Sequence, residues 1–137
     1  MRKLLETTAE NAIRYLEGLD ARNVAPTEEA RANLIQFDEP LPNQPIEPEL
    51  VLQLLDEIGS PASMAQAGSR FFGFVTGGSL PAALAANWLA AAWDQNCGLY
   101  RITPATALLE QVALRWLLDV LHLPAECECP SVSQRQK

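Results

Sequence analysis

The chain has 137 residues, of which 48% are hydrophobic, and its 17 acidic and 10 basic residues give a net charge of -7. This length and composition suit one globular domain with a modest core. The basic residues are scattered along the chain and outnumbered by acids. We therefore expect no nucleic acid partner, because such a partner selects a basic surface.

Neither a membrane span nor a signal peptide is expected. The longest apolar stretch, from Ser79 to Trp93, includes Asn87 and is shorter than the ~20 apolar residues that a helix needs to cross a bilayer. The start of the chain, Met1 to Leu5, runs directly into Glu6 without an apolar segment. A cytoplasmic location is the resulting prediction.

The first helices are predicted from the spacing of apolar residues and from helix-start signals. Apolar residues recur at helical spacing from Leu4 to Leu19, which predicts an amphipathic helix. Pro26 and Thr27 precede two glutamates and predict the start of a short helix that runs through Leu34.

Between Phe37 and Pro48, four prolines remove backbone donors, so this segment is expected to be an extended connection. A third helix is then indicated from Val51 to Ile58. Gly59, Ser60 and Pro61 follow in the order of a helix stop.

Two more helices are predicted in the second half. Ser79 is expected to cap a mostly buried helix that runs to about Asn96, and Thr103 precedes a helix that ends before Pro124. Only the segment 71–76 has strand character. The fold class is therefore mainly α, and the segment 125–137, which has no periodicity, is expected to be a disordered tail.

The residue types that often carry chemistry are sparse. His122 is the only histidine, and Cys127 and Cys129 lie far along the chain from Cys97, so four ligands for a tetrahedral zinc are not available. The three cysteines are expected to be free thiols, because their number is odd and no export signal is present. We predict no metal site and no catalytic residue in this chain.

A glycine pair, Gly77 and Gly78, precedes the helix that begins near Ser79. Such a pair forms a tight turn or lets a backbone approach an anion or a neighbouring chain closely, and its spacing does not decide between these. Three tryptophans on the last two predicted helices suit either a core or a subunit interface. They are Trp88, Trp93 and Trp116.

From Arg70 to Pro124 the chain reads RFFGFVTGGSLPAALAANWLAAAWDQNCGLYRITPATALLEQVALRWLLDVLHLP. This stretch resembles the group II pyridoxal-phosphate-dependent amino acid decarboxylases, the family of the aromatic amino acid, histidine and glutamate decarboxylases. The resemblance implies the N-terminal helical segment of a fold type I enzyme, similar to aspartate aminotransferase. It also implies a dimer, in which the helices before this stretch wrap around a second subunit.

Several site residues follow from the resemblance. The positions that match Phe74 and Thr76 border the substrate pocket in that family, with the threonine near the substrate carboxylate. The stretch from Asn96 to Tyr100 would reach the pocket of the partner subunit. The resemblance thus implies an amino acid substrate, pyridoxal phosphate as cofactor and release of CO2 by a lyase.

After Pro124 the chain departs from the family, which continues into the segments that hold the cofactor phosphate and carry the histidine, aspartate and Schiff-base lysine. The lysines here are Lys3 and Lys137, and neither lies in a sequence context where burial or a neighbouring cation would favour imine formation. We therefore expect a truncated decarboxylase that lacks the large α/β cofactor domain, binds no cofactor by itself and is inactive alone. Its predicted parts are N-terminal helices and connection (1–60), the family segment (61–124) and the tail (125–137).

Two alternatives belong to other classes. One alternative is a helical interaction module that dimerises or associates with a full-length homologue. Concentration-dependent association with preserved helicity would favour it. The other alternative is that the chain has no stable function, because helix faces that evolved to pack on a large domain are exposed and promote aggregation. Poor solubility of the purified chain would favour it.

Overall fold

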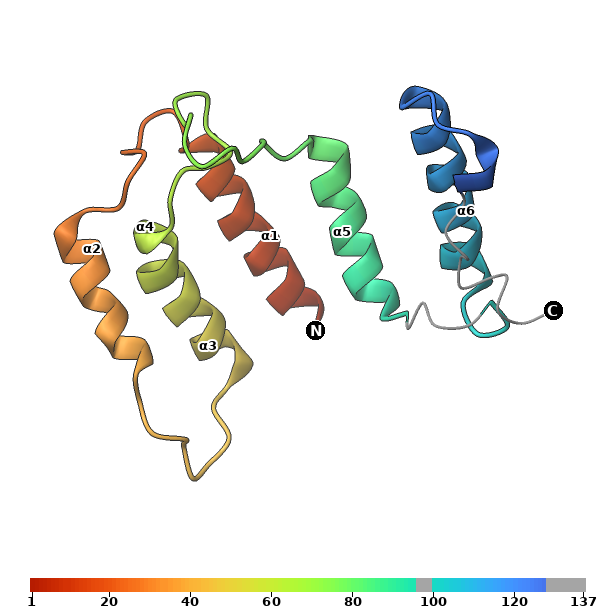
Figure 1. The fold of residues 1–137 in the computed structure, drawn as a ribbon. Helices are drawn as coiled ribbons and strands as arrows, with labels where there is room; N and C mark the ends of the chain where they lie inside the picture. Colours follow the sequence, from red (N-terminus) through yellow and green to blue (C-terminus); the bar gives the residue numbers. More distant parts are fainter. Residues whose placement is uncertain (96–99, 128–137) are drawn as a thin grey trace. The chain divides into compact units, whose positions relative to one another are not determined.

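A computed structural model gives the structure of the chain and describes residues 1–95 and 100–127. The described residues are mainly helical and include no strand, which confirms the predicted mainly α class. The chain divides into two compact units, 1–79 and 80–137 (Figure 1). No helix of the described part is both long enough and apolar enough to cross a membrane.

The first helix, α1, spans Arg2–Glu17, close to the predicted range. Its inward face is made of residues that are about half buried, among them Leu4, Ala9 and Tyr15, and the remaining positions are largely charged or polar. The helix ends at Gly18, whose amide donates to the carbonyl oxygen of Arg14 at 3.1 Å.

The second helix, α2, spans Glu28–Asn33 and continues into a 3-10 turn, η1, at Leu34–Phe37. The Thr27 hydroxyl accepts a hydrogen bond from the Ala30 amide at 3.1 Å, so Thr27 is the N-cap. The predicted short helix is therefore confirmed. The segment between Phe37 and Pro48 contains no helix, as its prolines predict.

The third helix does not stop where the sequence predicts. Helix α3, Pro48–Leu54, runs into a π-helical turn, η2, at Leu55–Gly59 and then into α4, Ser60–Ala62. The Ser60 amide bonds to the carbonyl oxygen of Leu55, five residues back, and Pro61 has no amide to pair. The helix therefore continues past Gly59, Ser60 and Pro61 as far as Ala62. The prediction that these three residues end it is wrong.

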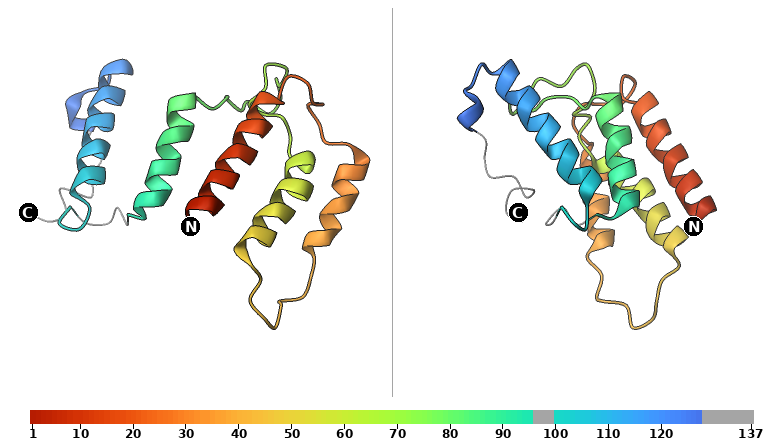
Figure 2. Two further views of the ribbon diagram at one scale, coloured as in Figure 1. Left: turned by 180° about the vertical axis from the view of Figure 1, so that it is seen from behind. Right: turned by 90° about the vertical axis from the view of Figure 1, so that its right-hand side faces the viewer.

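In the first unit, α3 and α4 lie between α1 and α2, as both Figure 1 and the rear view in Figure 2 show. Helix α3 contacts α1, and α4 contacts α2. The buried apolar residues of this unit are Ala30, Ile58 and Ala65, so its core is small. The Ala65 amide bonds to the carbonyl oxygen of Val24 at 3.0 Å and ties the segment after α4 to the segment after α1.

The segment 71–76 is a turn, and its predicted strand character is wrong. Phe74 and Val75 adopt φ values of 57° and 56°, in the left-handed region. A strand needs φ near -120° to -140°, so this pair excludes an extended run.

In the second unit, α5 spans Pro81–Trp93, and none of its residues, all of which are described, is buried. The predicted burial of this helix is therefore wrong, as is the predicted cap, because Leu80 occupies the N-cap position in place of Ser79. Its large apolar side chains Trp88, Leu89 and Trp93 are exposed.

Helix α6 spans Pro104–Val120 with Thr103 at its N-cap, as predicted, and it buries Ala107 and Leu118. At its end, the His122 amide donates to the carbonyl oxygen of Asp119 at 3.1 Å and the Leu123 amide to that of Leu118 at 2.9 Å. His122 has a φ of 53°. These bonds form a Schellman motif in which histidine occupies the position usually held by glycine.

A 3-10 turn, η3, at Ala125–Cys127 follows α6 and contacts it. Only these first three residues of the predicted tail belong to the described part, and Cys127 there is an exposed free thiol. Cys97 and Cys129 lie outside the described residues.

Candidate functional site

The predicted substrate-side residues lie on an exposed loop that connects α4 to α5. The Phe74 side chain is 82% exposed. The Thr76 hydroxyl donates to the Gly73 carbonyl oxygen at 3.2 Å, and the Thr76 amide donates to the same oxygen at 3.4 Å. Thr76 therefore stabilises the turn, and both side chains lie outside the cavities described below.

The backbone of this loop is strained. Left-handed φ values at two consecutive residues other than glycine cost about 1–2 kcal/mol each, and Val75 is β-branched, the type least suited to that region. A Cβ added at Gly77 or Gly78 would meet no atom within 4 Å. The glycine pair therefore makes no close approach to another described segment, and it lies outside the turn at 74–75.

The two residues predicted to reach a partner's pocket, Asn96 and Tyr100, belong to the second unit of the chain. Asn96 lies outside the described residues. Tyr100 precedes α6 and is half exposed. Its role in a shared pocket stays a prediction.

The start of the loop is fixed to the segment after α1. The Arg70 guanidinium donates to the carbonyl oxygens of Asp20, at 2.9 Å, and Arg22. The Ser69 hydroxyl donates to the Asp20 carboxylate at 3.1 Å. Because these contacts join residues about fifty positions apart, Arg70 sets where the loop leaves the first unit.

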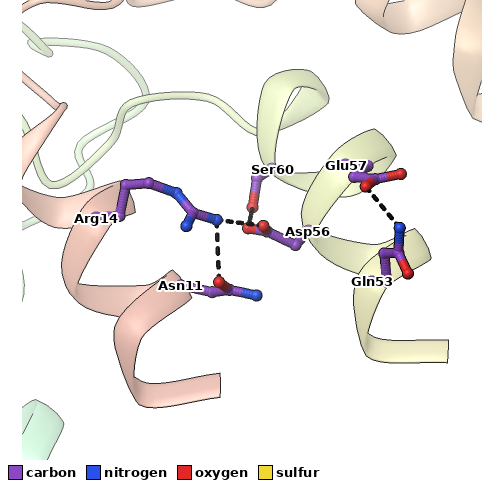
Figure 3. A network of polar contacts seen from close by, with 6 residues as sticks. All are labelled: Asn11, Arg14, Gln53, Asp56, Glu57 and Ser60. Carbon is purple, nitrogen blue, oxygen red and sulfur yellow. Dashed lines mark hydrogen bonds and ion pairs between the residues drawn. The ribbon is translucent and has the colours of Figure 1, made fainter. Parts of the chain in front are cut away.

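A polar cluster that the sequence analysis did not find joins α1 to the π turn (Figure 3). Arg14 forms an ion pair with Asp56, and its guanidinium also donates to the Asn11 side-chain oxygen at 3.0 Å. The Ser60 hydroxyl donates to Asp56 at 3.4 Å. Nearby, Gln53 donates to Glu57 at 2.8 Å. A separation of 42 residues between Arg14 and Asp56 leaves no local signal for this cluster.

A second arginine lies close to this cluster. The Arg22 guanidinium stacks over the Tyr15 ring at 4.5 Å from its centroid and donates to the carbonyl oxygens of Ser60 and Ser63. The Tyr15 hydroxyl donates to the Met64 carbonyl oxygen at 3.3 Å. Together these contacts hold the end of α4 against α1.

Residues 1–95 and 100–127 contain no group of three or more histidine, cysteine, aspartate or glutamate side chains placed to hold a metal ion. Lys3 is an exposed residue of α1, and Lys137 lies outside the described part of the chain. Searches against protein-family models, curated proteins and solved structures find no match to this chain.

Proposed function

We propose that this chain is the N-terminal helical part of a group II pyridoxal-phosphate-dependent amino acid decarboxylase of fold type I. The resemblance from Arg70 to Pro124 carries this proposal. In such an enzyme the chain supplies the substrate-side loop with Phe74 and Thr76 and helices that cover a larger domain and a second subunit. In that family the cofactor and the groups that act on it are held by segments that this resemblance does not cover.

Two features of the structure agree with that role. Helix α5 buries none of its residues, and α6 leaves Trp116 70% exposed, as expected of helices whose apolar faces contact a further domain. The Phe74 loop presents Phe72 and Phe74 to solvent and is fixed at its base by Arg70. A loop of this kind can complete a pocket formed by another part of an enzyme.

The gene offers the most direct test. We expect DNA downstream of the Pro124 codon to encode, in another reading frame, a glycine-rich segment, a Ser/Thr-rich turn and a lysine-bearing segment. The protein with this frame restored is expected to show the visible absorbance of an internal imine with pyridoxal phosphate and to release CO2 from an amino acid. If no frame contains these segments, the proposal is wrong.

The chain itself supplies a second measurement. Pyridoxal phosphate titrated into the purified chain is expected to give no saturable imine band. A band that disappears in a Lys3→Arg or Lys137→Arg variant would contradict the proposal, because it would place a cofactor site within these 137 residues.

A second candidate function is a helical interaction module that dimerises or associates with a full-length homologue. The exposed tryptophans favour it, because large aromatic side chains at the surface are typical of protein interfaces. Sedimentation velocity over a range of concentrations, with helicity followed by circular dichroism, tests this function. Association that Trp116→Arg abolishes while helicity is preserved would support it, and a monomer at all concentrations would exclude self-association.

A further inference from the structure

The first unit contains a cavity of about 470 Å³ that is broadly open to solvent, and all of its lining residues belong to α1, α2, η2, α4 and the segments between them. This volume lies within the range of about 300–1,000 Å³ that is typical of small-molecule sites. Its polar wall includes Arg14, Tyr15, Arg22, Asn23, Asp56 and Ser60.

The charges of this wall favour an anion. Two guanidinium groups face one carboxylate, and that carboxylate, Asp56, already pairs with Arg14 and accepts from Ser60. One positive charge is therefore left in a chain whose net charge is -7. A neighbouring cavity of about 340 Å³, which also reaches Asp56, has the opposite balance, with Glu49 and Glu57 against Lys3.

Arg22 supplies the remaining positive charge in a fixed orientation. Its ring contact with Tyr15 and its bonds to the carbonyl oxygens of Ser60 and Ser63 hold the guanidinium in place. Among the described residues, no carboxylate lies within ion-pair distance of Arg22. Both backbone bonds are donated by Nη2, so the donors of Nη1 and Nε remain available, and the fixed guanidinium is preorganised to bind a carboxylate through them.

We propose that this cavity binds a small aliphatic monocarboxylate. Its carboxylate pairs with Arg22, and its hydrocarbon part contacts the apolar wall at Ala25, Pro26 and Pro61. A single negative charge neutralises the site, whereas a phosphate dianion would leave an excess negative charge beside Asp56. This site is separate from the loop of Phe74 and Thr76, and the proposal stands independently of the decarboxylase assignment.

A titration of butyrate into the full chain tests the site. Binding is followed by the chemical shifts of the backbone amides. We expect saturable shifts at the lining residues with a dissociation constant of about 1–10 mM. Arg22→Gln removes the charge and is expected to weaken binding by about tenfold or more. Lys3→Gln, in the neighbouring cavity, is the matched control and should leave the affinity unchanged.

Butylammonium, the cation of the same shape, should not produce these shifts. No saturable shift with butyrate, equal binding of both probes, or an unchanged affinity in Arg22→Gln would each overturn the proposal. If Arg22→Gln does not fold, Asp56→Asn tests the proposal in its place. Removing the negative charge of Asp56 should tighten butyrate binding several-fold. An unchanged or weaker affinity in that variant would contradict the proposed site.

Discussion

Asp56 is the residue on which the contact between α1 and the π turn depends, since it accepts from both Arg14 and Ser60. Asp56→Ala is expected to lower the free energy of unfolding by about 1 kcal/mol, the upper end for a pair that water partly reaches. Urea unfolding followed by circular dichroism measures this loss.

The matched control for that variant is Glu57→Ala, which removes only the bond from Gln53 within the same helix. Its expected cost is about 0.3 kcal/mol. Equal losses in the two variants would mean that the ion pair between α1 and the π turn contributes nothing to stability.

Val75 holds the most unfavourable backbone conformation among the described residues, a left-handed φ with a β-branched and fully exposed side chain. Val75→Gly removes the Cβ clash, which outweighs the added freedom of the unfolded chain, so we expect a gain of about 0.5–1 kcal/mol. Thermal unfolding measures it. Val51→Gly, in helix α3, is the control and should cost about 0.5 kcal/mol.

At the scale of elements, Leu118 is the large side chain that α6 buries, whereas its neighbour Leu117 is 57% exposed. Leu118→Ala is expected to destabilise the second unit by about 2 kcal/mol because it leaves a cavity. Leu117→Ala should change stability by less than about 0.5 kcal/mol. Hydrogen exchange of α6 amides distinguishes the two variants, and equal effects would show that α6 has no packed side.

Helical spacing alone predicts most elements of this chain. Helices α1, α2 and α6 lie where apolar periodicity and capping residues place them. The predicted end of the third helix is wrong because the helix continues through a π turn at Leu55–Gly59 and on to Ala62, which apolar spacing does not indicate. The prediction that α5 is mostly buried is wrong. Composition shows how apolar a helix is, but burial also requires a neighbouring surface.

The candidate site residues differ in whether the sequence can indicate them. The family resemblance selects Phe74 and Thr76, which are close in sequence, and no local pattern indicates Arg14 with Asp56 or Arg22 over Tyr15. Those contacts depend on how α1 packs against the segment from α3 to α4. Long-range pairing of this kind leaves no trace in spacing, because polar residues at the surface of a helix look alike whether or not they have a partner.

For the molecule as a whole, net charge and exposed apolar area oppose each other. The net charge of -7 repels a second copy, and the exposed tryptophans and leucines of α5 and α6 favour association. Raising the salt concentration from about 20 mM to about 500 mM should therefore strengthen self-association, because salt screens the repulsion. Sedimentation velocity measures the change, and weaker association at high salt would show that ion pairs hold the copies together.

The left-handed pair at Phe74 and Val75 also bears on aggregation. An extended Phe-Phe-Gly-Phe-Val-Thr segment would present a row of unpaired amides and carbonyls beside aromatic and β-branched side chains, the composition that builds cross-β fibrils. Two consecutive left-handed residues break the alternation of side chains and turn the backbone groups out of line. The left-handed turn thus keeps this aromatic and β-branched segment from serving as a template for another copy.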